Sequence, residues 1–520
     1  MTITYRQLWR ADPAAWQRAA VAWRRQQPVL ARHGDRAATT VDDLRQAWSG
    51  TAADAATGQL AGLHERLAAA SPALFTVDQI LSGYAEQLGR AKSVLATWVG
   101  VAGELGLSVD RAGQVRADPA VTRPDGPTLA GARRVAAGIE QALAIATTAD
   151  TDAARRLDDA ATAASQGWPE RRPTDRPAPG AGPAAVRSWW DGLDQAEQRW
   201  LSRHEPGWVG RLDGLPATAR DQANRLLLAR QRAALLAERA RLLTTDAYSA
   251  TLVPQLRRLD QLLAGLDTVA DRLAAGTGPR AYLLALDTGT ENGAAGRVVV
   301  ALGDPDRADN VLTHVPGMGS GLDRAVGELD RAQRVQQRCH TLAPQESTAA
   351  VLWLDYTAPA FVDEAASAQL AHRGAADLHQ FQAGLRAAGQ GAPAELTVLG
   401  HSYGSLVVGT AAHEPGFAAD NVVFVGSPGV GVTRADDLAV PAGQVWASTA
   451  PDDAIRLTGL PRWPPGEQLW FGPDPSDPAF GARVFTSDAS GHAGYWAADN
   501  PALDSMARIV LGTGHQATVR

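Results

Sequence analysis

The sequence of 520 residues has a single cysteine, Cys339, and no long apolar run. One cysteine cannot form an internal disulfide, and it excludes a zinc cluster held by thiolates of this chain alone. The longest apolar stretch, Val94 to Leu107, contains Gly and Glu and is shorter than the ~18 to 20 residues that cross a bilayer. We therefore expect no transmembrane segment.

The chain also has no excess of basic over acidic residues. Asp and Glu number 56 and Lys and Arg 49, a formal net charge of −7, so the chain lacks the charge that would neutralise the phosphates of a nucleic acid. The pattern G-x-x-x-x-G-K-[ST] and any metal-ligand constellation are absent, and we expect no nucleic acid, cofactor or metal. The stretch MTITYRQLWRADPAAW has no basic segment followed by an apolar one, which predicts a cytoplasmic protein or export without a signal peptide.

Length and composition predict several folded parts. Hydrophobic residues make up 45% of the chain, enough for a packed core, and 520 residues correspond to about two to four domains. The stretch GWPERRPTDRPAPGAGPAA cannot continue a helix and is typical of a linker. We expect a helical module at 1–165, a Pro/Gly-rich linker at 166–185, a helical segment at 186–275 that packs on a final domain, and that domain at 276–520.

The first module has the composition and spacing of helices. It is rich in Ala, Leu, Arg, Gln and Glu, and apolar residues recur at spacings of three and four, as in Trp16, Ala20 and Trp23. Thr40, followed by Val-Asp-Asp, is expected to cap a helix that contains Trp48. These patterns predict an all-α module.

The pattern changes at Ala281, where short β-type runs begin to alternate with helical stretches. Such alternation favours a mostly parallel sheet covered by helices on both faces. We expect the sheet to begin with a hairpin, because its first two β-type runs are separated by the turn-forming stretch TGTENGAAG. The expected strands are 282–287, 297–303, 310–317, 350–356, 396–400, 421–427, 444–449 and 482–487, and the expected helices of this part are 363–388, 405–413 and 502–511.

Between one such strand and helix lies Gly400-His401-Ser402-Tyr403-Gly404. A nucleophilic serine on a sharp turn needs a strand before it and a helix after it, as in the G-x-S-x-G elbow. The flanking glycines let strand and helix approach each other around a strained residue whose hydroxyl stays exposed. The context therefore predicts Ser402 as a nucleophile.

A serine hydroxyl needs a base, and on this kind of fold the order along the chain is Ser, then acid, then His. Asp452 and Asp453 directly follow the strand that ends near Thr449. We favour Asp453, because Asp453-Ala454-Ile455 resembles the acid-small-aliphatic pattern seen after that strand in hydrolases with such an elbow, with Asp452 as the alternative.

The histidine should follow the last strand. SDASGHAGYW places His492 in a glycine-flanked loop at this position, and His515 in the C-terminal tail is its rival. His401 adjoins Ser402, but a neighbour on the elbow normally points away from the nucleophile. His314 and His413 fit structural roles better.

Acyl transfer also requires an oxyanion hole. One donor is expected to be the backbone N–H of Tyr403, which follows the nucleophile. The second should come from the glycine-rich loop after the third strand, His314-Val-Pro-Gly-Met-Gly-Ser320. Met318 N–H is the first candidate there and Gly319 N–H the second.

Several of these stretches together resemble an α/β-hydrolase family that is common in actinobacteria and was long described as a domain of unknown function. The matching pieces are SWWDGL…PGWVGRLDGLPATARDQANR, HVPGMGS, VLGHSYGS, VGSPGVGV and FGPDPSDPAFGARVFTSDASGHAGYW, which cover most of 186–500. The resemblance implies an α/β-hydrolase fold, preceded here by the all-α module, with a Ser-Asp-His triad at Ser402, Asp453 and His492. It implies no substrate.

The first module resembles a second family, the WxG helical-hairpin proteins of type VII secretion, at Trp48-Ser49-Gly50. That resemblance implies a helical-hairpin partner or self-association through this module, and a helical cap is the alternative. The Y-x-x-x-D/E export signal of such proteins lacks its acid at Tyr84 to Leu88, and at Tyr495 to Asp499 its letters fall in the proposed catalytic loop.

The function that these features predict is a serine hydrolase that cleaves an ester or other acyl bond of a small or lipid-like substrate. The alternatives are a peptidase or thioesterase with the same triad, and a non-catalytic, secretion-associated protein that uses the fold to bind a partner. The aromatic, Pro-rich stretch 460–475 either lines an acyl pocket or forms a surface loop.

Overall fold

The structure is a computed structural model that describes residues 2–117, 126–244, 252–276, 278–289, 295–441, 443–459, 471–489 and 491–519. Its contacts divide the chain into two compact units. The first comprises Met1–Arg171 with Gly276–Gly278, and the second comprises Arg172–Ala275 with Pro279–Arg520.

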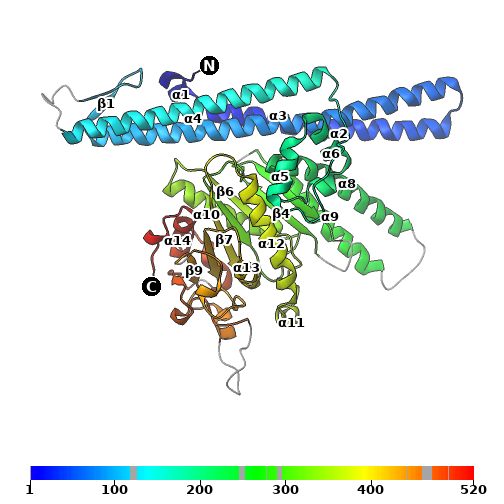
Figure 1. The fold of residues 1–520 in the computed structure, drawn as a ribbon. Coiled ribbons are helices and arrows are strands. Elements are labelled where there is room, and N and C mark those ends of the chain that lie inside the picture. Colours follow the sequence, from blue (N-terminus) through cyan, green and yellow to red (C-terminus); the bar gives the residue numbers. More distant parts are fainter. Residues whose placement is uncertain are drawn as a thin grey trace. The chain divides into compact units, whose positions relative to one another are not determined.

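Long helices dominate the first unit (Figure 1). The ion pair from Arg24 to Asp78 and the contact between His64 Nδ1 and the carbonyl oxygen of Gly34 join the helices Pro13–Ala47 and Thr51–Glu104. Residues farther before the turn pair with residues farther after it, so these helices are antiparallel. The elements of the unit are α1 (Tyr5–Arg10), α2 (Pro13–Ala47), α3 (Thr51–Glu104), β1 (Leu107–Val109), β2 (Val115–Ala117) and α4 (Gly126–Ser165).

One local prediction for this unit was wrong. Thr40 caps no helix, because α2 continues through it and its hydroxyl donates to the carbonyl oxygen of Arg36 at 2.8 Å. The chain turns instead at Trp48 to Gly50, where Gly50 has a φ of 117° that favours glycine. A short antiparallel hairpin, β1–β2, also interrupts the helices, because the Asp110 carboxylate accepts backbone N–H bonds that close its turn.

The second unit contains an eight-stranded sheet in the order β10-β9-β8-β7-β5-β6-β4-β3. Only β4 runs against the others among its described strands, so the prediction of a mostly parallel sheet is confirmed. The strands are β3 (Ala281–Asp287), β4 (Arg297–Leu302), β5 (Asn310–Val315), β6 (Thr348–Leu354), β7 (Glu395–His401), β8 (Asn421–Val425), β9 (Val445–Ser448) and β10 (Arg483–Val484).

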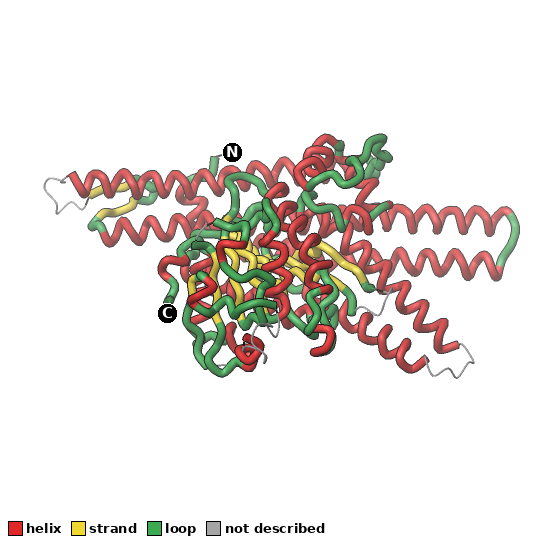
Figure 2. The backbone as a smooth tube through the Cα atoms, turned by 60° about the horizontal axis from the view of Figure 1, so that its bottom comes forward, coloured by secondary structure: helices red, strands yellow, loops and turns green. Residues whose placement is uncertain are grey.

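Helices cover both faces of this sheet, as Figure 2 shows. Successive side chains of a strand point to opposite faces. Along β8, Val422 and Phe424 join an apolar cluster with α12 and α13, whereas Val423 and Val425 join a cluster with α10 and α14. The helices are α10 (Ala325–Leu342), α11 (Val362–Ala365), α12 (Gln369–Ala388), α13 (Tyr403–His413) and α14 (Pro501–Val510), so the single helix expected at 363–388 is two.

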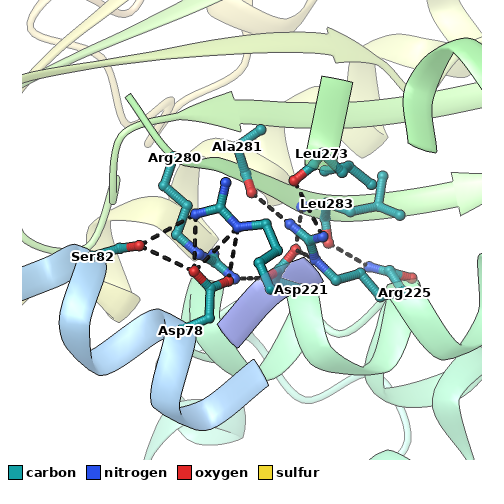
Figure 3. A network of polar contacts seen from close by, with 10 residues as sticks. Asp78, Ser82, Asp221, Arg225, Leu273, Arg280, Ala281 and Leu283 are labelled. Carbon is teal, nitrogen blue, oxygen red and sulfur yellow. Dashed lines mark hydrogen bonds and ion pairs between the residues drawn. The ribbon is translucent and has the colours of Figure 1, made fainter. Parts of the chain in front are cut away.

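Further helices of the second unit precede the sheet. They are α5 (Pro183–Gly192), α6 (Gln195–His204), α7 (Pro206–Val209), α8 (Ala217–Thr244) and α9 (Leu252–Ala274). Asp221 of α8 is fully buried between Arg225 and Arg280, and its carboxylate accepts the N–H of Leu283 in β3 (Figure 3). A buried carboxylate costs free energy unless it is paired in this way, so the network fixes α8 against the sheet. Short 3-10 helices complete the unit at η1 (Ala435–Asp437), η2 (Ala454–Gly459), η3 (Pro478–Phe480), η4 (Gly491–Trp496) and η5 (Gly514–Gln516).

Candidate active site

The predicted site residues follow the carboxyl ends of parallel strands. Ser402 directly follows β7, and Met318 lies in the loop after β5. Asp453 and His492 lie in the segments after β9 and β10. Because β5, β7, β8, β9 and β10 are parallel, these loops share one edge of the sheet, where α/β proteins bind their ligands.

Ser402 has a strained backbone. Its φ of 55° and ψ of −129° are rarely adopted by a residue with a side chain. The flanking glycines make the conformation possible: a Cβ on Gly400 would lie 2.6 Å from Ser405 Cα, and a Cβ on Gly404 would clash with the carbonyl oxygen of Val315. The strand and helix therefore approach too closely for any residue but glycine at these two positions.

Asp453, and not Asp452, contacts the imidazole of His492. His492 Nδ1 lies 3.0 Å from Asp453 Oδ1 and 2.9 Å from Oδ2. The Asp453 side chain is buried, and it also accepts hydrogen bonds from the Tyr495 hydroxyl and the Ile455 N–H. Asp452 is exposed and accepts the backbone N–H of Gly491 instead.

The environment of Asp453 favours its ionised form. Burial opposes ionisation, but the hydrogen bonds from His492, Tyr495 and the Ile455 N–H outweigh it, and the pKa of Asp453 lies below its ordinary value. A carboxylate at this place can orient His492 and stabilise its protonated form.

The Asp453–His492 pair lies close to Gly426, next to the strand residue that contacts Ser402. The Ser402 N–H donates to the carbonyl oxygen of Val425 at 3.1 Å. A Cβ on the next residue, Gly426, would lie 3.0 Å from Asp453 Oδ2 and 3.3 Å from His492 Cε1. Within the described parts of the chain no hydrogen bond joins the Ser402 hydroxyl to His492, and in unliganded sites such bonds are often long.

The loop after β5 lies directly against the elbow. A Cβ on Gly317 would be 2.6 Å from Ser402 Cβ and 3.0 Å from the Tyr403 nitrogen. Gly319 donates its N–H to the carbonyl oxygen of Pro359 at 2.7 Å, which leaves Met318 as the better of the two candidate donors. Tyr403 is the first residue of α13, where a backbone N–H has no partner within its helix.

His314, His413 and His515 lie in other surroundings. His314 is buried and its Nε2 contacts Glu328 at 3.1 Å, while His413 Nδ1 contacts the carbonyl oxygen of Asp437. His515 is exposed in η5 and pairs with its neighbour Gln516. Across the described residues, no group of His, Cys, Asp and Glu has the arrangement of a metal site.

Comparisons with known proteins agree with this architecture. A family model described as alpha/beta hydrolase matches residues 292–462. The uncharacterized protein Mb0988c of Mycobacterium bovis is 30% identical over 203 residues, which are 38% of this chain and 75% of that protein. This chain belongs to the alpha/beta hydrolase family.

A longer match joins this alpha/beta hydrolase to the uncharacterized protein Rv2079 of Mycobacterium tuberculosis. The two are 30% identical over 378 residues, which are 66% of this chain and 57% of the relative. The chain thus spans little more than half of that relative's length. The relatives' names state no substrate, so the comparisons identify the fold family of the hydrolase and not its reaction.

Two residues of the hydrolase site were not predicted as part of it. His401 Nε2–H donates to the carbonyl oxygen of His492 at 2.9 Å, and the two rings lie 4.8 Å apart. Burial, followed by the nearby charges of His492 and Arg331, lowers the pKa of His401 to about 3, so its ring is neutral. Tyr495 donates to Asp453 from three residues beyond His492. The signal in the sequence was its position three residues after His492, which places both residues on one helical turn.

The structure bears on two further sequence observations. Tyr495, the first letter of the Y-x-x-x-D pattern at 495–499, is fully buried beside Asp453 and not presented at the surface. Of the aromatic stretch 460–475, residues 460–470 lie outside the described residues.

Proposed function

We propose that this hydrolase cleaves an ester or other acyl bond of a small or lipid-like substrate, with Ser402 as nucleophile. The observation that carries the proposal is the strained backbone of Ser402 at the same sheet edge as the Asp453–His492 pair. The strained backbone of Ser402 lowers stability, and so does the burial of the Asp453 carboxylate beside His492. A catalytic role explains why the fold keeps both features.

The reaction would begin at the Ser402 hydroxyl. His492 Nε2 accepts the hydroxyl proton while Ser402 Oγ attacks the acyl carbon, and Asp453 stabilises the imidazolium that forms. The carbonyl oxygen becomes an oxyanion that accepts hydrogen bonds from the N–H groups of Tyr403 and Met318. Each such donor is worth about 3 kcal/mol in the transition state.

The second half of the cycle releases the acyl group. The C–O bond to the leaving group breaks, and His492 returns its proton to that group, which leaves an acyl ester on Ser402. A water molecule then gives a proton to His492 and attacks the ester, and Ser402 regains its proton as the acid leaves. No cofactor takes part in this scheme.

A fluorophosphonate probe tests the nucleophile. We expect the purified protein to be labelled, Ser402→Ala to lose labelling, and Ser405→Ala to keep it, because the Ser405 hydroxyl is buried and donates to the carbonyl oxygen of Gly400. Folded protein that takes no label would overturn the proposal and favour a role in partner binding. Labelled protein would then be compared on ester, thioester and peptide substrates.

A further inference from the structure

Tyr495 lies at the centre of a short chain of hydrogen bonds behind the proposed base. Its hydroxyl accepts the Ala450 N–H at 3.0 Å and donates to Asp453 Oδ2 at 2.6 Å. The same oxygen lies 2.9 Å from His492 Nδ1. One carboxylate oxygen is therefore shared between a phenol and an imidazole.

The surroundings hold this arrangement tightly. Tyr495 is fully buried, and its ring packs edge-on against Trp496. The Tyr495 hydroxyl and Asp453 Oδ2 are 2.6 Å apart, too close for a water molecule between them, and a Cβ on Gly426 would lie 3.2 Å from that hydroxyl and 3.0 Å from that oxygen. A phenol in such a position donates directly to the carboxylate.

We infer that Tyr495 is a positioning residue of the proposed triad, which fixes the Asp453 carboxylate and limits how strongly it attracts the proton of His492. The inference rests on the proposed function. The physical reason is that a donor to a carboxylate stabilises its charge and makes it a weaker partner for imidazolium. Because the Ala450 N–H polarises the phenol, its effect on Asp453 is strengthened.

Other titratable and charged groups lie near Tyr495, Asp453 and His492. His401 faces His492, with Glu328 and Arg331 behind His401. Asp474 faces Tyr495, and Asp452 holds the Gly491 N–H beside His492. Substitution of Tyr495 leaves all of these in place, so a change in the titration of His492 reports on the phenol.

The test is Tyr495→Phe, which removes one oxygen atom and keeps the ring. We expect the kinetic pKa on the acid limb of kcat/KM to rise by about half a unit to one unit, because Asp453 then holds the imidazolium more strongly. We expect kcat/KM to fall about tenfold to a hundredfold from poorer orientation of His492. NMR titration of the His492 imidazole in labelled protein should show the same rise without any turnover.

Tyr356→Phe is the matched control. Its buried hydroxyl donates to the carbonyl oxygen of Pro316, also at 2.6 Å, whereas Asp453 accepts its hydrogen bonds from other residues. We expect this variant to leave the titration of His492 unchanged. Site-specific 3-fluorotyrosine at position 495, a more acidic phenol, should lower the titration and provides a second measurement if Tyr495→Phe does not fold.

The outcomes separate the two proposals. An unchanged or lowered titration of His492 in folded Tyr495→Phe would overturn the inference and leave Tyr495 a packing residue. A wild type that neither turns over esters nor takes the probe would overturn the proposed function, and the NMR titration would still decide the role of Tyr495.

Discussion

At the scale of single residues, Asp453 and Asp452 are adjacent in sequence and differ in what they contact. Asp453 is buried and contacts His492 with both oxygens, whereas Asp452 is exposed and accepts the backbone N–H of Gly491 near His492. If the proposed mechanism holds, Asp453→Asn lowers kcat by about a thousandfold to ten-thousandfold, because the imidazolium loses its partner. Asp452→Asn should lower it less than about tenfold, since an amide oxygen can still accept the Gly491 N–H. Steady-state kinetics on one ester checks both, and equal losses would contradict the assignment.

His401 gives a prediction about stability and pH. Its pKa is lowered to about 3 in the folded protein, from the ordinary value of 6.5. Below pH 6.5 the unfolded chain therefore binds a proton that the folded chain does not, so this histidine's contribution to stability is present above pH 6.5 and is lost as the pH falls toward 3. His401→Gln should reduce the slope of unfolding free energy against pH in this range by up to about 1.4 kcal/mol per unit.

The measurement is urea unfolding of both proteins at several pH values between 4 and 7. Gln can still donate to the carbonyl oxygen of His492, so the loop contact has a substitute in the variant. Parallel stability curves for the two proteins would mean that His401 is protonated as readily in the folded state as in the unfolded one.

The sequence predicted the residues that a motif or chain order can specify. Ser402 has the elbow pattern, and Asp453 and His492 follow the expected strands. Tyr495 and His401 contact partners that lie 42 and 91 residues away along the chain. Which of many tyrosines and histidines meets such a partner depends on how three separate loops pack, and no local pattern carries that information.

At the scale of elements, the elbow depends on the close approach of β5, β7 and α13. Gly404→Ala would place a Cβ against the carbonyl oxygen of Val315, which is held in the sheet and cannot move away cheaply. We expect a loss of about 3 kcal/mol of stability or more, together with loss of probe labelling, because the loop after β5 shifts as well.

Gly327→Ala is the control for that substitution. A Cβ at this position in α10 would meet no atom within 4 Å, and alanine favours a helix over glycine. The variant should gain about 0.5 to 1 kcal/mol. Denaturant unfolding compares the two, and a Gly404→Ala protein as stable as the wild type would show that the elbow tolerates a side chain.

Elements were predicted best where the apolar pattern is long and regular. The alternation of buried strands and helices after Ala281 sufficed for the parallel sheet. The β1–β2 hairpin was missed because its strands have three residues each and its turn depends on the Asp110 side chain. The break between α11 and α12 has no glycine or proline to mark it. Instead, the Tyr403 hydroxyl holds the chain there through the carbonyl oxygen of Ser367 and the N–H of Ala371.

At the scale of the whole molecule, the helical unit keeps two open predictions. Its α2 and α3 form a long antiparallel pair around Trp48-Ser49-Gly50, but a resemblance to secreted WxG proteins and a helical-hairpin partner both remain predictions. No helix of the described chain has the length and apolarity to cross a membrane. We also predict that this unit folds separately from the hydrolase.

The chain between α4 and α5 provides the experiment that tests this prediction. Residues 166–182 have no helix or strand, and Arg171 and Arg172 are exposed. Farther on, Arg176 packs over the Trp208 ring at 4.6 Å and pairs with Glu205, which ties this end of the predicted linker to the hydrolase unit. Trypsin does not cut before proline, and prolines follow both Arg172 and Arg176. Brief trypsin treatment should therefore cut this segment after Arg171, and it should yield two resistant fragments.

If the first unit folds by itself, its fragment keeps a helical circular dichroism spectrum and melts on its own, because α3 and α4 bury an apolar cluster of their own with α1 and β1. The larger fragment should keep probe labelling at Ser402, since α5–α14 and the whole sheet remain on it. Protection of 167–185, or a first fragment that unfolds on release, would mean that the helical unit needs the hydrolase for its stability. The linker would then be a connection within one folding unit.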